Sequence, residues 1–417
     1  MKTNKNSFEH SVGMFLMCIY VITSFVAVNG LLNESYNTLA LYAFLGVGFV
    51  IVGLNIKKVR FTTYTIWNIL FLAVSIITMG YGPEFKIMSG QFYLMIVSFF
   101  LTFFFQLFIR NGEDFKKMCW FYTFSSLFLM LLLHSKGMLV GTSDERLGQD
   151  TFGNANIFAA LMMIAVLYEL WLLIYGTKKP LLKIFVIFVI LYNMYGLSLS
   201  AGRKYVLIPF IYLYLLLIYK TNKNGRKHIV LYTLLMALLI GSAYTAIMRI
   251  PVLYESLGIR MEAMLDKTSE AAEDDGSSRN REIMRKDAFS QWQKKPLSGY
   301  GFDSYKYRAK EVVRHFYYSH CNYVEMLYNG GILYFLLYYW IYYKIFIEAF
   351  RRKNVPQEYR AFAIATSISL FIYDYGAISY TAAINHIMFA LALKLIYSYS
   401  NSTASNINGE ISNIEKV

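Results

Sequence analysis

The sequence predicts an all-α, polytopic integral membrane protein with about 12 transmembrane helices. Of its 417 residues, 57% are hydrophobic and only 16% are charged, whereas about 25% charged is usual for a water-soluble protein. Apolar runs long enough to cross a hydrocarbon core of about 30 Å recur along the chain. They begin near residues 12, 38, 62, 91, 116, 157, 183, 204, 228, 322, 359 and 381.

The positive charges support this topology, because short cytoplasmic loops hold an excess of Lys and Arg. With the N-terminus inside, 22 of the 40 basic residues fall in cytoplasmic segments and five in short outer loops. The remaining 13 lie in one long outer segment from Arg249 to about Cys321. We therefore expect a cytoplasmic (inner) membrane protein with both termini in the cytoplasm. Nucleic acid is not an expected partner, because the basic residues interrupt apolar runs and form no soluble patch.

These patterns divide the chain into four parts. Residues 1–248 are expected to form nine membrane helices, and residues 249–321 a large, partly helical extracytoplasmic loop. Residues 322–400 are expected to form the last three helices. The segment 401–417 is rich in Asn, Ser and Thr and lacks apolar periodicity, so we expect a disordered cytoplasmic tail.

The large outer loop contains a predicted helix that follows an acidic, flexible segment at 266–278. Ser277 and Ser278 are candidate caps for this helix. One face then carries Arg281, Met284, Ala288, Phe289 and Trp292. Arg279 and Lys286 project elsewhere, at 100° per residue. An arginine on the packed face needs an anionic partner, which is either a loop carboxylate, a lipid headgroup or a bound diphosphate.

Two further candidates flank predicted membrane helices on the same outer side. Arg203, in the sequence LSLSAGRKY, is either a flanking residue that extends to the interface or an anion-binding group. His320 is either an interfacial polar group or a general base, because its unperturbed pKa is near 6.5. Asn322 and Glu325 lie close enough along the chain to orient it.

Other polar groups lie at the outer ends of predicted helices. Asp374 and His386 interrupt apolar runs, where ionisable groups usually face a cavity or a partner. The structural alternative is that Asp374 pairs with His386 or with an arginine. Arg146 precedes the run QDTFGNAN, most of which is explained by turns and helix capping. We expect no metal and no cofactor, because the sequence has no HExxH pattern, no His/Cys ligand cluster, no P-loop and no dinucleotide-binding glycine pattern.

Four segments of the chain resemble motifs of the O-antigen polymerase and O-antigen ligase superfamily. They are RLGQDTFGNAN, SLSAGRKY, SRNREIMRKDAFSQW with PLSGYGF, and SHCNYVEMLYNGG, in the order and spacing typical of that superfamily. The resemblance implies a substrate carried on undecaprenyl diphosphate and a glycosidic bond made outside the membrane. It also implies that Arg203 and Arg281, or Arg279 in place of Arg281, bind the diphosphate and that His320 is the base. The other residues expected to bind substrate are Arg146, Arg285, Asn322, Glu325, Asp374 and His386.

The predicted function is a polysaccharide polymerase that joins lipid-linked oligosaccharide repeat units of a capsule, O-antigen or exopolysaccharide. Guanidinium groups stabilise the charge that develops on the leaving diphosphate, and the base activates the incoming hydroxyl in an inverting transfer. The expected partners are the lipid-linked saccharide, the bilayer and other polysaccharide-assembly proteins. A ligase, a lipid-linked oligosaccharide flippase or other transporter, and a non-catalytic scaffold are the alternatives.

Overall fold

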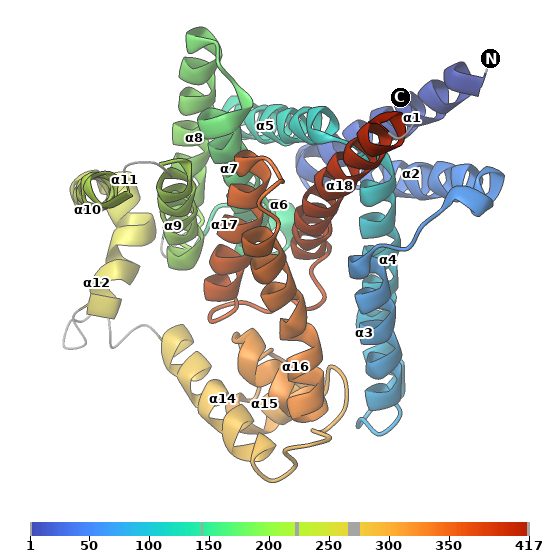
Figure 1. The fold of residues 1–417 in the computed structure, drawn as a ribbon. Helices are drawn as coiled ribbons and strands as arrows, with labels where there is room; N and C mark the ends of the chain where they lie inside the picture. The colour runs from blue at the N-terminus through green and yellow to red at the C-terminus, as the bar shows by residue number, and fades with distance from the viewer. Residues whose placement is uncertain (1, 143–144, 222–224, 266–275, 415–417) are drawn as a thin grey trace. The chain divides into compact units, whose positions relative to one another are not determined.

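The computed structural model describes residues 2–142, 145–221, 225–265 and 276–414, and the regular elements in these residues are all helices (Figure 1). Each of the twelve predicted apolar runs falls in one of the long helices. These are α1 (Lys2–Val26), α2 (Ser35–Leu54), α3 (Thr63–Met79), α4 (Phe85–Phe108), α5 (Gly112–Ser135), α7 (Ala155–Trp171), α8 (Pro180–Leu199), α9 (Arg203–Lys220), α10 (Gly225–Arg249), α16 (Asn322–Arg351), α17 (Gln357–Tyr373) and α18 (Ala383–Ile414).

Eight helices of the described residues are long and apolar enough to cross a membrane. The apolar helices over Thr63–Met79 and Ala383–Tyr399 are shorter. The chain is therefore an integral, multi-pass membrane protein, as predicted, while the count of twelve crossings stays a prediction. α18 continues as helix to Ile414, through most of the segment for which the sequence predicts a disordered tail. Asn, Ser and Thr lower helix propensity by only fractions of a kcal/mol, so a helix can extend from the apolar part into this segment.

The chain divides into two compact units. The first comprises Met1–Val59 and Gly112–Gly276, and the second comprises Arg60–Asn111 and Ser277–Val417. In the first unit α7 packs against α5, α8 and α9, and 72% of its apolar stretch is buried, whereas only 6% of the apolar stretch of α10 is buried. α7 is thus the central helix of this unit, which suits a helix that is hydrophobic all round.

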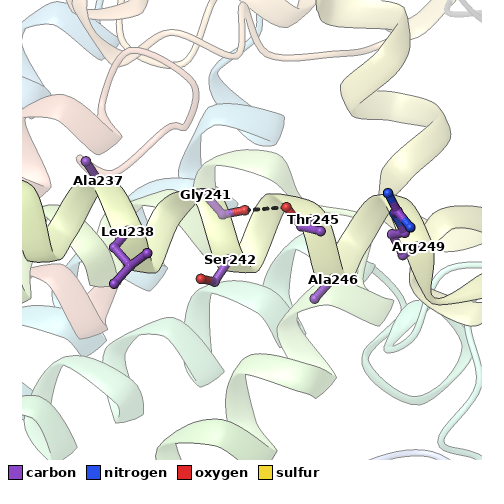
Figure 2. A pocket seen from close by; sticks show the side chains of 7 residues that line it. All are labelled: Ala237, Leu238, Gly241, Ser242, Thr245, Ala246 and Arg249. Carbon is purple, nitrogen blue, oxygen red and sulfur yellow. Dashed lines mark hydrogen bonds between the residues drawn. The ribbon is translucent and has the colours of Figure 1, made fainter.

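The face of α10 carries a shallow hollow with a volume of about 740 Å³ (Figure 2). Small side chains on successive turns account for it, and the Thr245 hydroxyl donates back to the Gly241 carbonyl at 2.9 Å. The residues that line the hollow are Ala237, Leu238, Gly241, Ser242, Thr245, Ala246 and Arg249. None of them is among the predicted site residues.

In the second unit α4 packs against α18 and α3, and α16 packs against α17, α18 and α3. The large predicted loop is shared between the two units. Its first part belongs to the first unit and contains α11 (Pro251–Leu253), the π-helix η3 (Tyr254–Gly258) and α12 (Ile259–Leu265). Its second part contains α14 (Gly276–Trp292) and α15 (Tyr305–Val313), which pack with α16 in the second unit. Residues 266–275 of the acidic segment predicted to be flexible lie outside the described residues.

Candidate functional site

The predicted loop helix exists as α14, and its packed face is partly as expected. Met284 and Ala288 are buried, with exposed fractions of 1% and 0%, and Arg281 is half-buried. Arg279 is exposed, in agreement with its predicted direction. The prediction was wrong for Phe289, which is 44% exposed, because the buried stripe on this helix is narrow and follows an i, i+4 spacing. It was also wrong for the caps, since α14 already includes Gly276, so that Ser277 and Ser278 lie in its first turn.

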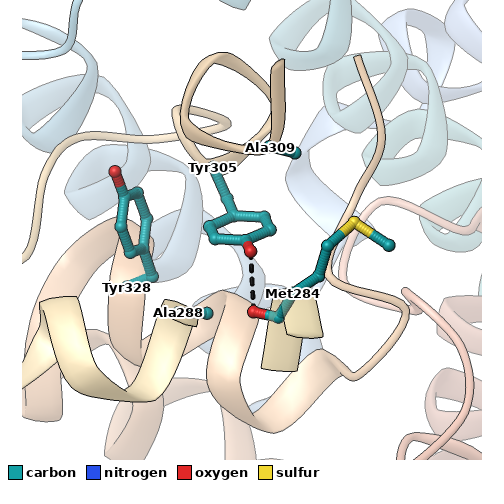
Figure 3. Packing of buried hydrophobic residues seen from close by; sticks show 5 residues of the cluster. All are labelled: Met284, Ala288, Tyr305, Ala309 and Tyr328. Carbon is teal, nitrogen blue, oxygen red and sulfur yellow. Dashed lines mark hydrogen bonds between the residues drawn. The ribbon is translucent and has the colours of Figure 1, made fainter. Parts of the chain in front are cut away.

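A small hydrophobic cluster holds α14 against α15 and the beginning of α16 (Figure 3). The Tyr305 hydroxyl donates to the Met284 carbonyl at 2.6 Å. Alanines at the contact allow the helices to come close, and Tyr328 stacks on Tyr300 with ring centroids 4.6 Å apart. The buried members of the cluster are Met284, Ala288, Tyr305, Ala309 and Tyr328.

An ion pair adds a polar contact between the same two helices. Arg308 of α15 donates to Asp287 of α14 with Nε and Nη2, at 3.2 and 2.8 Å to Oδ1. It also donates to Glu311 at 2.7 Å. These hydrogen bonds raise the pKa of Arg308 above its usual value. The bidentate geometry fixes the angle between α14 and α15 as well as their distance.

A break in α16 anchors this loop assembly to the helix bundle of the second unit. Gly331 has φ 71° and ψ −170°, a conformation essentially restricted to glycine, within a helix that otherwise runs from Asn322 to Arg351. The backbone groups freed by the break bond to the segment 296–301, at 2.8 Å in each case. The donor and acceptor pairs are Tyr300 N to Tyr328 O, Gly301 N to Asn329 O, and Ile332 N to Pro296 O.

The side chain of Asn329, just before the break, caps α15. Its Oδ1 accepts from the backbone N–H groups of Ser304 and Tyr305 at 3.2 and 3.3 Å. Its Nδ2 donates to the Tyr380 hydroxyl at 3.4 Å. The first N–H groups of a helix have no partner within the helix, so this side chain satisfies donors of α15 from a different element.

His320 occupies a constrained position at the entry to α16. Its φ is 57°, which is uncommon for a residue other than glycine and occurs often at functional sites. The preceding residue, Ser319, is fully buried, and its N–H donates to Glu325 Oε2 at 2.8 Å. The Ser319 hydroxyl donates to the Cys321 carbonyl at 3.0 Å. Glu325 therefore holds the backbone of the turn that carries His320.

α14 reaches the surroundings of this turn through Arg285. The Arg285 guanidinium lies 5.1 Å from the centre of the Tyr375 ring. Burial raises the pKa of the Cys321 thiol, and the positive charge of Arg285 partly offsets this effect. Arg285 thus acts electrostatically on the residue directly after His320.

Asn322 and Asp374 bond to each other and to groups on neighbouring elements. The Asn322 amide donates to Tyr339 at 3.0 Å and to Asp374 Oδ2 at 3.3 Å, and its oxygen accepts from the N–H groups of Ser379 and Tyr380 at 3.1 and 3.3 Å. Both side chains are fully buried. Asn322 therefore ties α16 to the segment between α17 and α18.

The hydrogen bonds of Asp374 differ from the structural alternative, in which it pairs with His386 or an arginine. Asp374 Oδ2 accepts from the Tyr342 hydroxyl at 2.7 Å and from the Tyr339 hydroxyl at 3.0 Å. His386, 2% exposed, bonds to the Tyr64 hydroxyl at 2.7 Å and to the Tyr380 carbonyl at 2.8 Å. Neutral hydroxyls thus bond to one oxygen of this buried side chain, and the tyrosine-rich sequence of α16 supplies them.

In the first unit, two arginines that the sequence predicts to be site residues lie at the turn between α8 and α9. Arg146 donates to the Ser200 carbonyl at 2.8 Å and to the Asn156 side chain at 3.2 Å, so it holds this turn in place. Arg203 is the first residue of α9 and donates to the Arg260 carbonyl at 2.5 Å. The structure therefore brings the backbone of Arg260, a residue of the long loop that the sequence analysis did not single out, to Arg203.

The chain is thus an integral membrane protein in which α14 and α15, which carry several cations, pack against the beginning of the long apolar helix α16. A family model described as O-antigen ligase matches residues 186–339, from α8 through the first half of α16. No curated protein matches the chain. Residues 186–339 are thus similar to the O-antigen ligase family, which confirms the predicted resemblance over this part of the chain.

Proposed function

We propose that the protein is a polymerase that joins undecaprenyl-diphosphate-linked oligosaccharide repeat units at the outer face of the cytoplasmic membrane. The observation that carries the proposal is the rigid attachment of α14 to the turn before α16. The cluster around Tyr305, the Arg308–Asp287 pair and the break at Gly331 hold an arginine-bearing helix and His320 in one assembly. Cations and a base that are held on one assembly suit a reaction that expels an anion while it deprotonates a hydroxyl.

The proposed reaction is an inverting displacement without metal or cofactor. The acceptor hydroxyl oxygen forms a bond to the anomeric carbon of the donor saccharide, and the bond from that carbon to the diphosphate oxygen breaks. His320 takes the hydroxyl proton, and the lipid diphosphate leaves with the bonding electron pair. Arg203 and Arg281 bind the diphosphate and stabilise its developing charge through bidentate hydrogen bonds.

The supporting residues fall into two groups. Arg285 contributes positive charge beside Cys321, and Arg146 holds the turn that carries Arg203. The half-buried position of Arg281, on the side of Met284, favours it over the exposed Arg279 as the functional arginine. Glu325 acts on His320 through Ser319, whereas the hydrogen bonds of Asn322, Asp374 and His386 support a role in holding helices together.

A ligase is the second candidate, because the matching family model bears that description. The donor chemistry is the same in both reactions, and only the acceptor differs. The test is to reconstitute the purified protein with the lipid-linked repeat unit as the only substrate and to resolve product lengths. A polymerase gives a ladder of longer chains. A ligase gives none until a separate glycan acceptor is added.

Single substitutions test the assigned residues in the same assay. We expect Arg203→Ala, Arg281→Ala and His320→Ala each to abolish or shorten the ladder. Lys286→Ala is the matched control, because Lys286 lies on α14 but is 77% exposed and pairs with Glu282. If the three variants give the same chain lengths as the wild type, the assignment of these residues is wrong.

A further inference from the structure

The segment between α15 and α16 presents aromatic rings to solvent beside His320. Its two ends are left-handed, with φ of 62° at Arg314 and 57° at His320. Between them Phe316 is 51% and Tyr317 is 45% exposed, while Ser319 is fully buried and bonded to Glu325. The segment is thus fixed at the end that bears His320, and its rings project outward just before that point.

The two exposed rings differ in their surroundings. Tyr317 is close to two imidazoles, with its ring centre 5.3 Å from that of His315 and 6.3 Å from that of His320. Phe316 already has a cation over its ring, the Lys310 ammonium at 4.7 Å, and contacts Tyr307 edge to face at 5.7 Å. Tyr317 is therefore the exposed ring that adjoins the proposed base.

We propose that Tyr317 is the stacking platform for the sugar residue whose hydroxyl His320 deprotonates. This inference rests on the proposed function, because it assumes a saccharide acceptor. A pyranose ring has a face of C–H groups that packs on an aromatic ring, while its hydroxyls remain at the edge and can reach a neighbouring base. An aromatic ring that is held beside the base limits the orientations that the acceptor sugar can take. Such positioning can account for a large part of an enzyme's rate enhancement.

An aromatic residue at a membrane boundary can instead serve as an interfacial anchor. The two roles predict different results for the two exposed rings. Anchoring depends on aromatic character at both positions, so Phe316 and Tyr317 should matter alike. Stacking beside His320 depends on Tyr317 alone, and the ring suffices without its hydroxyl.

The experiment compares Tyr317→Ala, Tyr317→Phe and the matched control Phe316→Ala in the reconstituted full-length protein. The probe is a soluble repeat-unit oligosaccharide used as acceptor and titrated at a fixed concentration of the lipid-linked donor. We expect Tyr317→Ala to raise the acceptor KM about fivefold, which corresponds to a stacking contribution of about 1 kcal/mol, and to leave the donor KM unchanged. Tyr317→Phe and Phe316→Ala should behave as the wild type.

Saturation-transfer NMR measures binding of the same oligosaccharide in the absence of donor. This measurement needs no turnover, so it separates this inference from the proposed function. Loss of the signal in Tyr317→Ala, with its retention in Tyr317→Phe and in His320→Ala, supports the platform. An unchanged acceptor KM and signal in Tyr317→Ala overturns it, as does equal impairment in Tyr317→Phe or Phe316→Ala. A wild-type protein that binds the saccharide through Tyr317 but forms no product overturns the proposed function and leaves the platform supported.

Discussion

The break in α16 predicts a large loss of stability for Gly331→Ala. A Cβ at this position would lie 2.1 Å from the Leu297 carbonyl oxygen and 2.4 Å from its carbon, both of them backbone atoms. The alanine would also have to keep φ 71° and ψ −170°, which only glycine adopts readily. The substitution therefore combines conformational strain with a clash that side-chain rotation cannot relieve.

The expected magnitude follows from these two effects. The backbone conformation costs an alanine about 2 kcal/mol. Displacement of the 296–301 segment weakens the three hydrogen bonds at the break, each worth about 1 kcal/mol. We expect Gly331→Ala to lower the free energy of unfolding by about 3 to 5 kcal/mol. Gly137→Ala is the matched control, because Gly137 also has a positive φ, of 66°, but a Cβ there meets nothing within 4 Å. Its expected cost is about 1 kcal/mol.

The assay is denaturant unfolding of both purified variants in detergent, together with limited proteolysis of the segment between α10 and α16. Gly331→Ala should unfold at lower denaturant concentration than Gly137→Ala and should be cleaved faster between α14 and α16. Equal stability of the two variants would refute the reasoning, because it would mean that the 296–301 segment does not pack against the break.

Two other predictions concern the same assembly. Asn329→Leu removes the acceptor that caps α15 and should lower the free energy of unfolding by about 2 kcal/mol, whereas Asn329→Asp, which keeps an acceptor oxygen, should lose less; equal losses would contradict this role. Burial raises the pKa of Asp303 from 3.8 to about 6, although its ion pair with Lys306 acts in the opposite direction. The folded protein therefore binds the proton of the Asp303 carboxyl more tightly than the unfolded chain does. The contribution of this protonation to the free energy of unfolding is full below about pH 4 and is lost as the pH rises through 6. Relative to Asp303→Asn, the wild type should lose about 2 kcal/mol between pH 4 and pH 7, measured by unfolding at each pH, and parallel curves would contradict the assignment.

The sequence was sufficient to locate the helices and the packed face of the loop. Apolar runs of membrane-spanning length predicted the long helices, because backbone groups in lipid must be satisfied within the helix. The 3.6-residue period placed Met284 and Ala288 on one buried face, as observed. Phe289 lies on the edge of that stripe, and periodicity alone does not determine how wide a buried stripe is.

Long-range partners were not predictable from the sequence. Gly330 and Gly331 lie in an apolar run that is compatible with a continuous helix, and the groups that fill the break come from the 296–301 segment. Asn322 was expected to orient His320 because the two are close along the chain. Three of its partners, Asp374, Ser379 and Tyr380, are more than 50 residues away, and only the fold brings them together.

The partner of the Glu325 carboxylate could not be predicted from the sequence either. Its proximity to His320 in sequence was informative, but its partner is the backbone N–H of Ser319. A backbone group leaves no signature in the sequence. The left-handed conformation of His320 is likewise not predictable from the residue pattern, since histidine occurs there only occasionally.

Binding of undecaprenyl diphosphate by the purified protein tests the central claim most directly, because the claim is that outer arginines hold the leaving group. Native mass spectrometry or a thermal-shift titration gives the Kd for the wild type and for the Arg203→Ala, Arg281→Ala, His320→Ala and Lys286→Ala variants. We predict about a tenfold or larger increase in Kd for each of the first two, with His320→Ala and Lys286→Ala unchanged. Wild-type affinity in both arginine variants would contradict the claim.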